Sequence, residues 1–169
     1  MERIGFIGLG VMGLPMAQNL ARKLARTGHA LKVWNRTPGR CADIPEAKAV
    51  ARPAGLADRD VVFVNVSDDA ALEAVLFGPD GLASVPGRAI VVDMGTTSPT
   101  CTRDCARRLG ERGLSLIDAP VSGGEAGAIA GTLSIMAGGD ATTFERVLPL
   151  LECLGRNIVH VGETGAGQI

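Results

Sequence analysis

Three glycines near the N-terminus have the spacing of a phosphate-binding turn. In such a turn the first glycine permits a tight reversal, the second lets a pyrophosphate approach the backbone, and the third lets the next helix pack on the preceding strand. Free N–H groups at the helix N-terminus add positive potential. We therefore expect this run to bind the pyrophosphate of a dinucleotide, and a turn without a ligand is the alternative. Its residues are Gly8, Leu9, Gly10, Val11, Met12 and Gly13.

The second predicted strand is followed by Asn35, Arg36 and Thr37. Domains that select NAD usually place Asp or Glu here, where the carboxylate binds the ribose 2′-hydroxyl. A guanidinium instead pairs with a 2′-phosphate, which a carboxylate would repel. We therefore expect these residues to contact the cofactor and to favour NADP(H), with NAD(H) also accepted. If Arg36 is only a solvated residue stacked on adenine, the selectivity will be weak.

A second glycine-rich run, residues 118–128, also follows a predicted strand and contains Ser122, Gly123 and Gly124. Consecutive backbone N–H groups and a hydroxyl can hold a carboxylate without a charged side chain. Taken alone, the run fits a carboxylate site and a tight connection before a helix equally well.

Four motifs in order make the chain similar to the β-hydroxyacid dehydrogenase family, of the 3-hydroxyisobutyrate dehydrogenase type. They are the glycine turn at residues 8–13, the glycine-rich run at residues 118–128, Asp93-Met94-Gly95-Thr96-Thr97-Ser98-Pro99, and Gly165-Ala166-Gly167. The resemblance covers essentially the whole chain. It implies an enzyme that transfers a hydride between NADP(H) and a short 3-hydroxy acid or its semialdehyde.

The resemblance also implies roles for individual residues. Ser122, Gly123 and Gly124 would bind the substrate carboxylate and hydroxyl, and Thr96 would contact the cofactor near the nicotinamide ribose. Val66 and Ser67, after another predicted strand, would border the cofactor.

No catalytic residue is expected within the chain. The family's third motif runs Gly-x-Gly-x-x-x-Lys, and a lysine counted from Gly165 would fall beyond Ile169. His160 is expected to be structural. The lysines present are predicted on the first helix, the second strand and the loop after it, away from the nicotinamide, and they are Lys23, Lys32 and Lys48. Losing a general acid or base typically slows a reaction about 10²–10⁴-fold, so the chain alone should be nearly inactive.

We expect residues 1–162 to form one dinucleotide-binding domain and residues 163–169 to begin a hinge. In the family this hinge leads to a helical domain, which is missing here. The full-length protein is expected to form a homo-oligomer through that domain.

Apolar runs alternate with helix-period segments along the chain. Strands are predicted at residues 3–7, 31–34, 61–66, 89–93, 114–118, 133–137 and 157–161. Helices are predicted at residues 15–27, 69–77, 100–112 and 141–154. This alternation predicts an α/β fold: a Rossmann-like, doubly wound, mostly parallel sheet with helices on both faces.

The composition excludes several classes of partner. A net charge of -1 provides no field for nucleic acid or an anionic membrane. No apolar run approaches the roughly 20 residues that span a bilayer. Because the strand pattern begins almost at Met1, we expect no signal peptide and a cytoplasmic location.

The cysteines form no CxxC pair, and we expect them to be buried, reduced thiols. No zinc or other metal site is expected, since His29 and His160 lack ligand spacing. The cysteines are Cys41, Cys101, Cys105 and Cys153.

Two other functions remain open. A relative of 6-phosphogluconate dehydrogenase would share the glycine turn, Asn35-Arg36-Thr37 and Ser122-Gly123-Gly124, although residues 118–121 and 133–139 look more like the short-substrate group. The second alternative is a non-catalytic nucleotide-sensing module that naturally ends at Ile169.

Overall fold

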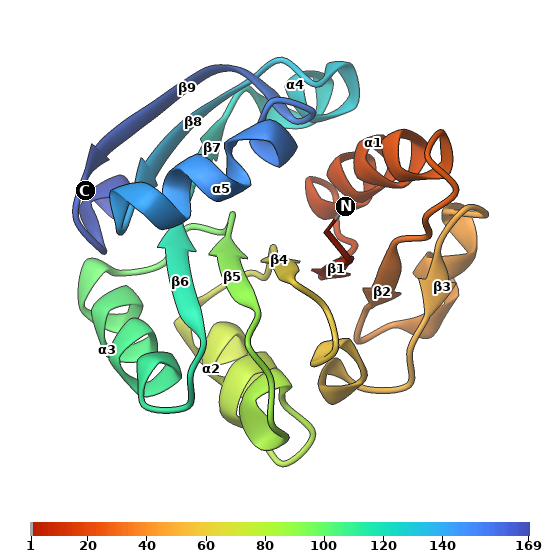
Figure 1. The fold of residues 1–169 in the computed structure, drawn as a ribbon. Helices are drawn as coiled ribbons and strands as arrows, with labels where there is room; N and C mark the ends of the chain where they lie inside the picture. Colours follow the sequence, from red (N-terminus) through yellow and green to blue (C-terminus); the bar gives the residue numbers. More distant parts are fainter. Residues whose placement is uncertain (1) are drawn as a thin grey trace.

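The computed structural model describes residues 2–169, and its centre is a single nine-stranded sheet (Figure 1). The order is β3-β2-β1-β4-β5-β6-β8-β7, and β9 pairs with β8. The strands are β1 (Ile4–Ile7), β2 (Lys32–Trp34), β3 (Lys48–Ala49), β4 (Val61–Val64), β5 (Ile90–Asp93), β6 (Ser115–Asp118), β7 (Val121–Ser122), β8 (Leu133–Gly138) and β9 (Gly155–Gly162).

Helices cover both faces of the sheet. Figure 1 shows α1 (Gly13–Ala25) and α5 (Ala141–Leu151) on one side, and α2 (Asp69–Phe77) and α3 (Pro99–Gly110) on the other. A short helix, α4 (Gly124–Ala130), contacts α1 and β8. Glycine ends the first helix: Gly28 has φ +75°, and the next N–H, that of His29, donates back to the carbonyl of Leu24.

The core forms because the central strands are apolar on both faces, as parallel strands between helix layers must be. Along β4, Val61 and Phe63 pack with α1 and α5, whereas Val62 and Val64 pack with α2 and α3. Phe63 stacks on Phe6 of β1, with ring centroids 6.0 Å apart.

The predicted fold class is confirmed, and all predicted strands and helices exist. The helix boundaries shift: α1 begins at Gly13 rather than 15 and ends at Ala25, and α3 and α5 end at Gly110 and Leu151. The short elements β3, β7 and α4 were not predicted. At one end the sheet is not parallel, since β8 runs antiparallel to β6 and β7 and parallel to β9.

The topology fixes where a ligand can bind. From β1 the chain moves one way through β2 and β3, then returns to the other side of β1 with β4. Ligands of such sheets bind beyond the carboxyl ends of the strands, at this switch point. Within residues 2–169, no helix is long and apolar enough to cross a membrane.

Candidate cofactor and substrate site

The three glycines of the turn after β1 differ in what surrounds them. A Cβ at Gly8, where φ is +98°, would lie 2.0 Å from the carbonyl oxygen of Asn65, and one at Gly13 would lie 1.9 Å from that of Gly8. At Gly10, which is exposed, nothing lies within 4 Å of such an atom. The fold therefore requires glycine at 8 and 13. At position 10 the fold leaves open space beside the backbone.

Asn35 joins the turn after β2 to the glycine turn. Its side-chain oxygen accepts from the N–H of Leu9 at 2.8 Å, and its amide nitrogen donates to the carbonyl of Thr37 at 3.0 Å. The N–H of Gly8 also donates to the carbonyl of Trp34 at 3.0 Å. Asn35 thus holds the shape of the glycine turn from the neighbouring strand.

A cleft of about 480 Å³ opens at the switch point, within the size range of ligand pockets. One wall comes from the ends of β1 and β2, and the other from the end of β4 and from α2. Arg36 on its rim is exposed and takes part in none of the ion pairs among the described residues. The cleft is lined by Gly8, Gly10, Trp34, Asn35, Arg36, Pro53, Asn65, Val66, Ser67, Ala71, Ala74, Val75, Gly78, Pro79, Asp80 and Gly81.

Several predicted cofactor residues line this cleft: Gly8, Gly10, Asn35, Arg36, Val66 and Ser67. The side chain of Leu9 is fully buried, so only its backbone is available to a ligand. Val11 is 61% exposed beside the turn, and Met12 packs partly on the core. Thr37 is exposed and Thr96 is exposed at the end of β5, both outside the cleft lining.

The predicted substrate residues lie at the carboxyl end of β7. Ser122 ends β7, and Gly123 and Gly124 lead into α4 with φ +136° and +64°, values that favour glycine. All three are exposed. The chain leaves β6, the parallel neighbour of β5, after Asp118, at the same edge of the sheet as the Thr96 loop. Ser122 lies four residues further on and pairs with Ser134 of β8.

Two buried carboxylates lie beneath these loops. Burial raises the pKa of Asp93 to about 7, while hydrogen bonds from the Gly95 N–H and the Thr97 hydroxyl oppose the rise and the Asp118 charge adds to it. Both of those bonds are 3.0 Å long. Asp118 accepts from the N–H groups of Gly165 and Gly167, each at 2.8 Å.

Sequence reasoning missed Gln168. Its side-chain oxygen accepts from the N–H of Thr97 at 3.1 Å, and its amide nitrogen donates to the carbonyl of Gly95 at 2.9 Å. It thus holds the loop on either side of Thr96. No local sequence pattern predicts this contact. Asp93 and Asp118 could have been predicted as functional residues, because each is the carboxylate that ends an apolar strand.

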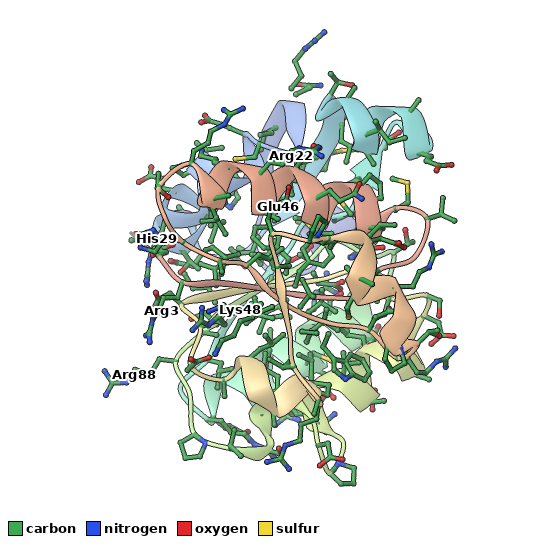
Figure 2. All side chains as sticks on the ribbon, turned by 90° about the vertical axis from the view of Figure 1, so that its right-hand side faces the viewer. Arg3, Arg22, His29, Glu46, Lys48 and Arg88 are labelled. Atoms are coloured by element: carbon green, nitrogen blue, oxygen red, sulfur yellow. The ribbon has the colours of Figure 1, made fainter. Side chains whose placement is uncertain are left out.

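The lysines lie away from the strand ends that form the cleft. Lys32 begins β2 and pairs with Asp58 at 3.1 Å, and Lys23 donates to the carbonyl of Pro149 at 3.4 Å. Lys48 begins β3, where it pairs in register with Lys32, and Figure 2 shows it toward the same side of the view as Arg3 and Arg88.

His160 has structural contacts, as expected. It bonds to the carbonyl of Gly139 at 2.7 Å and stacks on Phe144 at 4.9 Å. All four cysteines are free thiols, with Cys101 and Cys105 buried and Cys41 and Cys153 only half-buried. Among residues 2–169, no cluster of His, Cys, Asp and Glu could hold a metal ion.

A glycine turn between β1 and α1, a cleft at the switch point and open strand-end loops define a dinucleotide-binding domain of the Rossmann type. The family profile described as the NAD binding domain of 6-phosphogluconate dehydrogenase matches residues 3–162, and the chain belongs to this family.

Curated relatives support the predicted resemblance. The chain is 48% identical to 2-hydroxy-3-oxopropionate reductase of Escherichia coli, over 98% of this chain and 56% of that protein. It is 40% identical to 3-hydroxyisobutyrate dehydrogenase of Pseudomonas aeruginosa, over 100% of this chain and 57% of that protein. The chain therefore spans somewhat more than half the length of these relatives.

A solved structure of Mycobacterium tuberculosis 3-hydroxyisobutyrate dehydrogenase with L-serine has a TM-score of 0.88 and 33% identity, over 99% of this chain and 57% of that one. A structure of Psf3 in complex with NADP+ and 2-OPP has a TM-score of 0.88 and 29% identity, over 98% of this chain and 58% of that one.

Proposed function

We propose that this domain binds NADP(H) in preference to NAD(H), with the pyrophosphate on the turn Gly8–Gly13 and the adenosine in the cleft. The open space at Gly10 carries the first part of this proposal, because no protein atom approaches the position where a phosphate would lie. The exposed Arg36 on the cleft rim carries the second, because a 2′-phosphate would pair with it. Psf3 was solved with NADP+, whereas a Pseudomonas aeruginosa relative is named NAD-dependent L-serine dehydrogenase.

We infer that the whole protein is an oxidoreductase acting on a short 3-hydroxy acid or its semialdehyde. The names of the relatives support this class, and the exposed run Ser122-Gly123-Gly124 could hold a carboxylate. The acid/base would be a lysine that follows Gly165-Ala166-Gly167 beyond residue 169. The residues of this chain that line the cleft, together with Ser122-Gly123-Gly124, would then orient cofactor and substrate, while the bound nicotinamide supplies the hydride chemistry.

We further propose that a helical domain follows residue 169 in the whole protein and mediates its oligomerisation. Met136 and Val159 face each other in register on β8 and β9 and are 51% and 46% exposed, which suits a surface that another domain covers.

We also propose a cytoplasmic location for the protein. The four free thiols are consistent with a reducing, cytoplasmic location.

Calorimetric titration of the 169-residue chain with NADPH and NADH tests the cofactor proposal. We expect both to bind and NADPH to bind more tightly. Absence of binding would refute the cofactor site, and tighter NADH binding would refute the preference.

The reaction is tested with the protein from the complete coding sequence. We expect NADPH-dependent reduction of tartronate, succinic or methylmalonate semialdehyde, or of glyoxylate. Activity only on 6-phosphogluconate would favour the phosphorylated sugar acid, and cofactor binding without any turnover would favour a nucleotide-sensing module.

A further inference from the structure

The segment 165–168 is bound at the ends of two strands, β5 and β6, that lie far away in sequence. Asp118, at the end of β6, holds the N–H groups of Gly165 and Gly167 with its two carboxylate oxygens. Gln168, within the same segment, holds the backbone on both sides of Thr96. The segment therefore bridges the ends of β5 and β6.

The space around this bridge is closely fitted. A Cβ at Gly138 would lie 2.7 Å from Oδ2 of Asp118, and one at Gly167 would lie 2.4 Å from the carbonyl oxygen of Met136. Asp118 is fully buried, so it has no water to replace the two backbone donors. The position of the segment is thus fixed by the carboxylate and by the backbone that surrounds it.

The Thr96 loop is held from two sides. Asp93 binds it from beneath, at the Gly95 N–H and the Thr97 hydroxyl, and Gln168 binds it from the C-terminal segment. Thr96 itself bears no such contact to these side chains and is exposed between its two anchored neighbours. If this loop becomes more or less ordered, the hydrogen bonds of Gln168 become more or less stable with it. A change at Gln168 has the same effect on the loop.

We propose that Gln168 and Asp118 are positioning residues that join the Thr96 loop to the segment 165–168, so that cofactor bound at Thr96 orders this segment. The proposal rests on the proposed cofactor function. In a protein that continues beyond residue 169, the same contacts would hold the following residues in a fixed relation to the nicotinamide. The two side chains would act through other groups and would not touch the reacting atoms.

Amide hydrogen exchange of the 169-residue chain without cofactor tests the contacts. We expect Gln168→Ala to raise the exchange rate of the Thr97 amide about tenfold, and Asp118→Asn to raise those of Gly165 and Gly167. The matched control is Gln18→Ala, which removes a glutamine that donates to the carbonyl of Asp43 in the turn after β2, toward the other end of the strand order. Unchanged exchange at Thr97 in Gln168→Ala overturns the proposal, even if Asp118→Asn fails to fold.

The same measurement with NADPH tests the coupling. We expect NADPH to slow exchange at Gly165 and Gly167 in the unaltered chain, and Gln168→Ala to remove that slowing and weaken NADPH binding several-fold. If NADPH binds but leaves both amides unchanged, the coupling is wrong and the cofactor site stands. If NADPH and NADH do not bind at all, the proposed function fails, and the coupling fails with it.

Discussion

Asp93 and Asp118 occupy paired positions on the parallel strands β5 and β6, and both carboxylates are fully buried. Each uses its two oxygens to hold a loop at the strand ends, the Thr96 loop in one case and the segment 165–167 in the other. Unpaired buried charge is strongly unfavourable, so such groups persist where hydrogen bonds satisfy them. Here those bonds shape the edge of the sheet where cofactor and substrate are proposed to meet.

Gly10→Val should strongly weaken dinucleotide binding and leave the fold intact. A Cβ at this position would meet no protein atom within 4 Å, and the valine side chain would enter the space proposed for the pyrophosphate. We expect NADPH to bind at least about tenfold more weakly, measured by calorimetry, with an unchanged melting temperature. Gly110→Val, at the equally open end of α3, is the matched control. Normal NADPH binding by Gly10→Val would refute the phosphate site.

Arg36→Ala should weaken NADPH binding about tenfold or more and change NADH binding little. A charge-assisted, bidentate pair with the 2′-phosphate would be lost, and NADH offers no such group. Fluorescence titration with both cofactors measures the two affinities. Arg40→Ala, on the 3₁₀ turn Pro38–Asp43, serves as the control. Equal losses for NADPH and NADH would instead mean that Arg36 stacks on adenine.

Asn35→Ala should destabilise the glycine turn. The Leu9 N–H would lose its acceptor, and an unsatisfied, partly buried donor costs about 1–3 kcal/mol. We expect urea denaturation to report a loss of this order, together with weaker cofactor binding. Asn157→Ala, at an exposed position of β9, should have little effect on either measurement. An unaltered free energy of unfolding in Asn35→Ala would show that the turn holds its shape without this contact.

Asp93→Asn should flatten the pH dependence of stability. Burial raises the pKa of Asp93 from 3.8 to about 7, so between these values the folded protein retains a proton that the unfolded chain has released. The contribution of Asp93 to the free energy of unfolding is therefore complete below pH 4 and is lost as the pH rises toward 7, with a slope approaching about 1.4 kcal/mol per pH unit.

Urea denaturation at pH 5, 6, 7 and 8 measures this slope. Asparagine can still accept from Gly95 and donate to Thr97, so Asp93→Asn should keep the loop and lose the slope. Asp104→Asn is the control, because the Arg107 hydrogen bond lowers the pKa of that exposed carboxyl and its contribution changes only below pH 4. Identical slopes for Asp93→Asn and the unaltered chain would contradict the raised pKa.

Most of the fold was predictable because strand periodicity and turn signals agree along this chain. The unbroken apolar runs at β4 and β5 indicate strands buried on both faces, and the glycine turn marks where β1 ends and α1 begins. The strands β3 and β7 were not predicted because each is only two residues long, which is too short to show a hydrophobic periodicity. The helix α4 escaped because its sequence begins with Gly124 and includes Gly127, which are poor helix formers.

The site was predictable where backbone geometry creates it and unpredictable where distant contacts do. Gly8 and Gly10 follow from a local motif, and Arg36 follows from its place after β2. Gln168 reaches residues that precede it by more than 70 positions, and Asp118 binds amides nearly 50 positions later. Such contacts depend on the strand order, which local pattern does not supply.

Trp34 lines the cleft at the switch point and donates its indole N–H to the carbonyl of Ala51 at 3.3 Å. The chain has one tryptophan and no tyrosine. The ultraviolet fluorescence of this protein therefore comes almost entirely from Trp34, in one wall of the cleft. Reduced nicotinamide absorbs in the region where indole emits, so the protein carries its own optical reporter of occupancy, and binding in the cleft is readable without any added label.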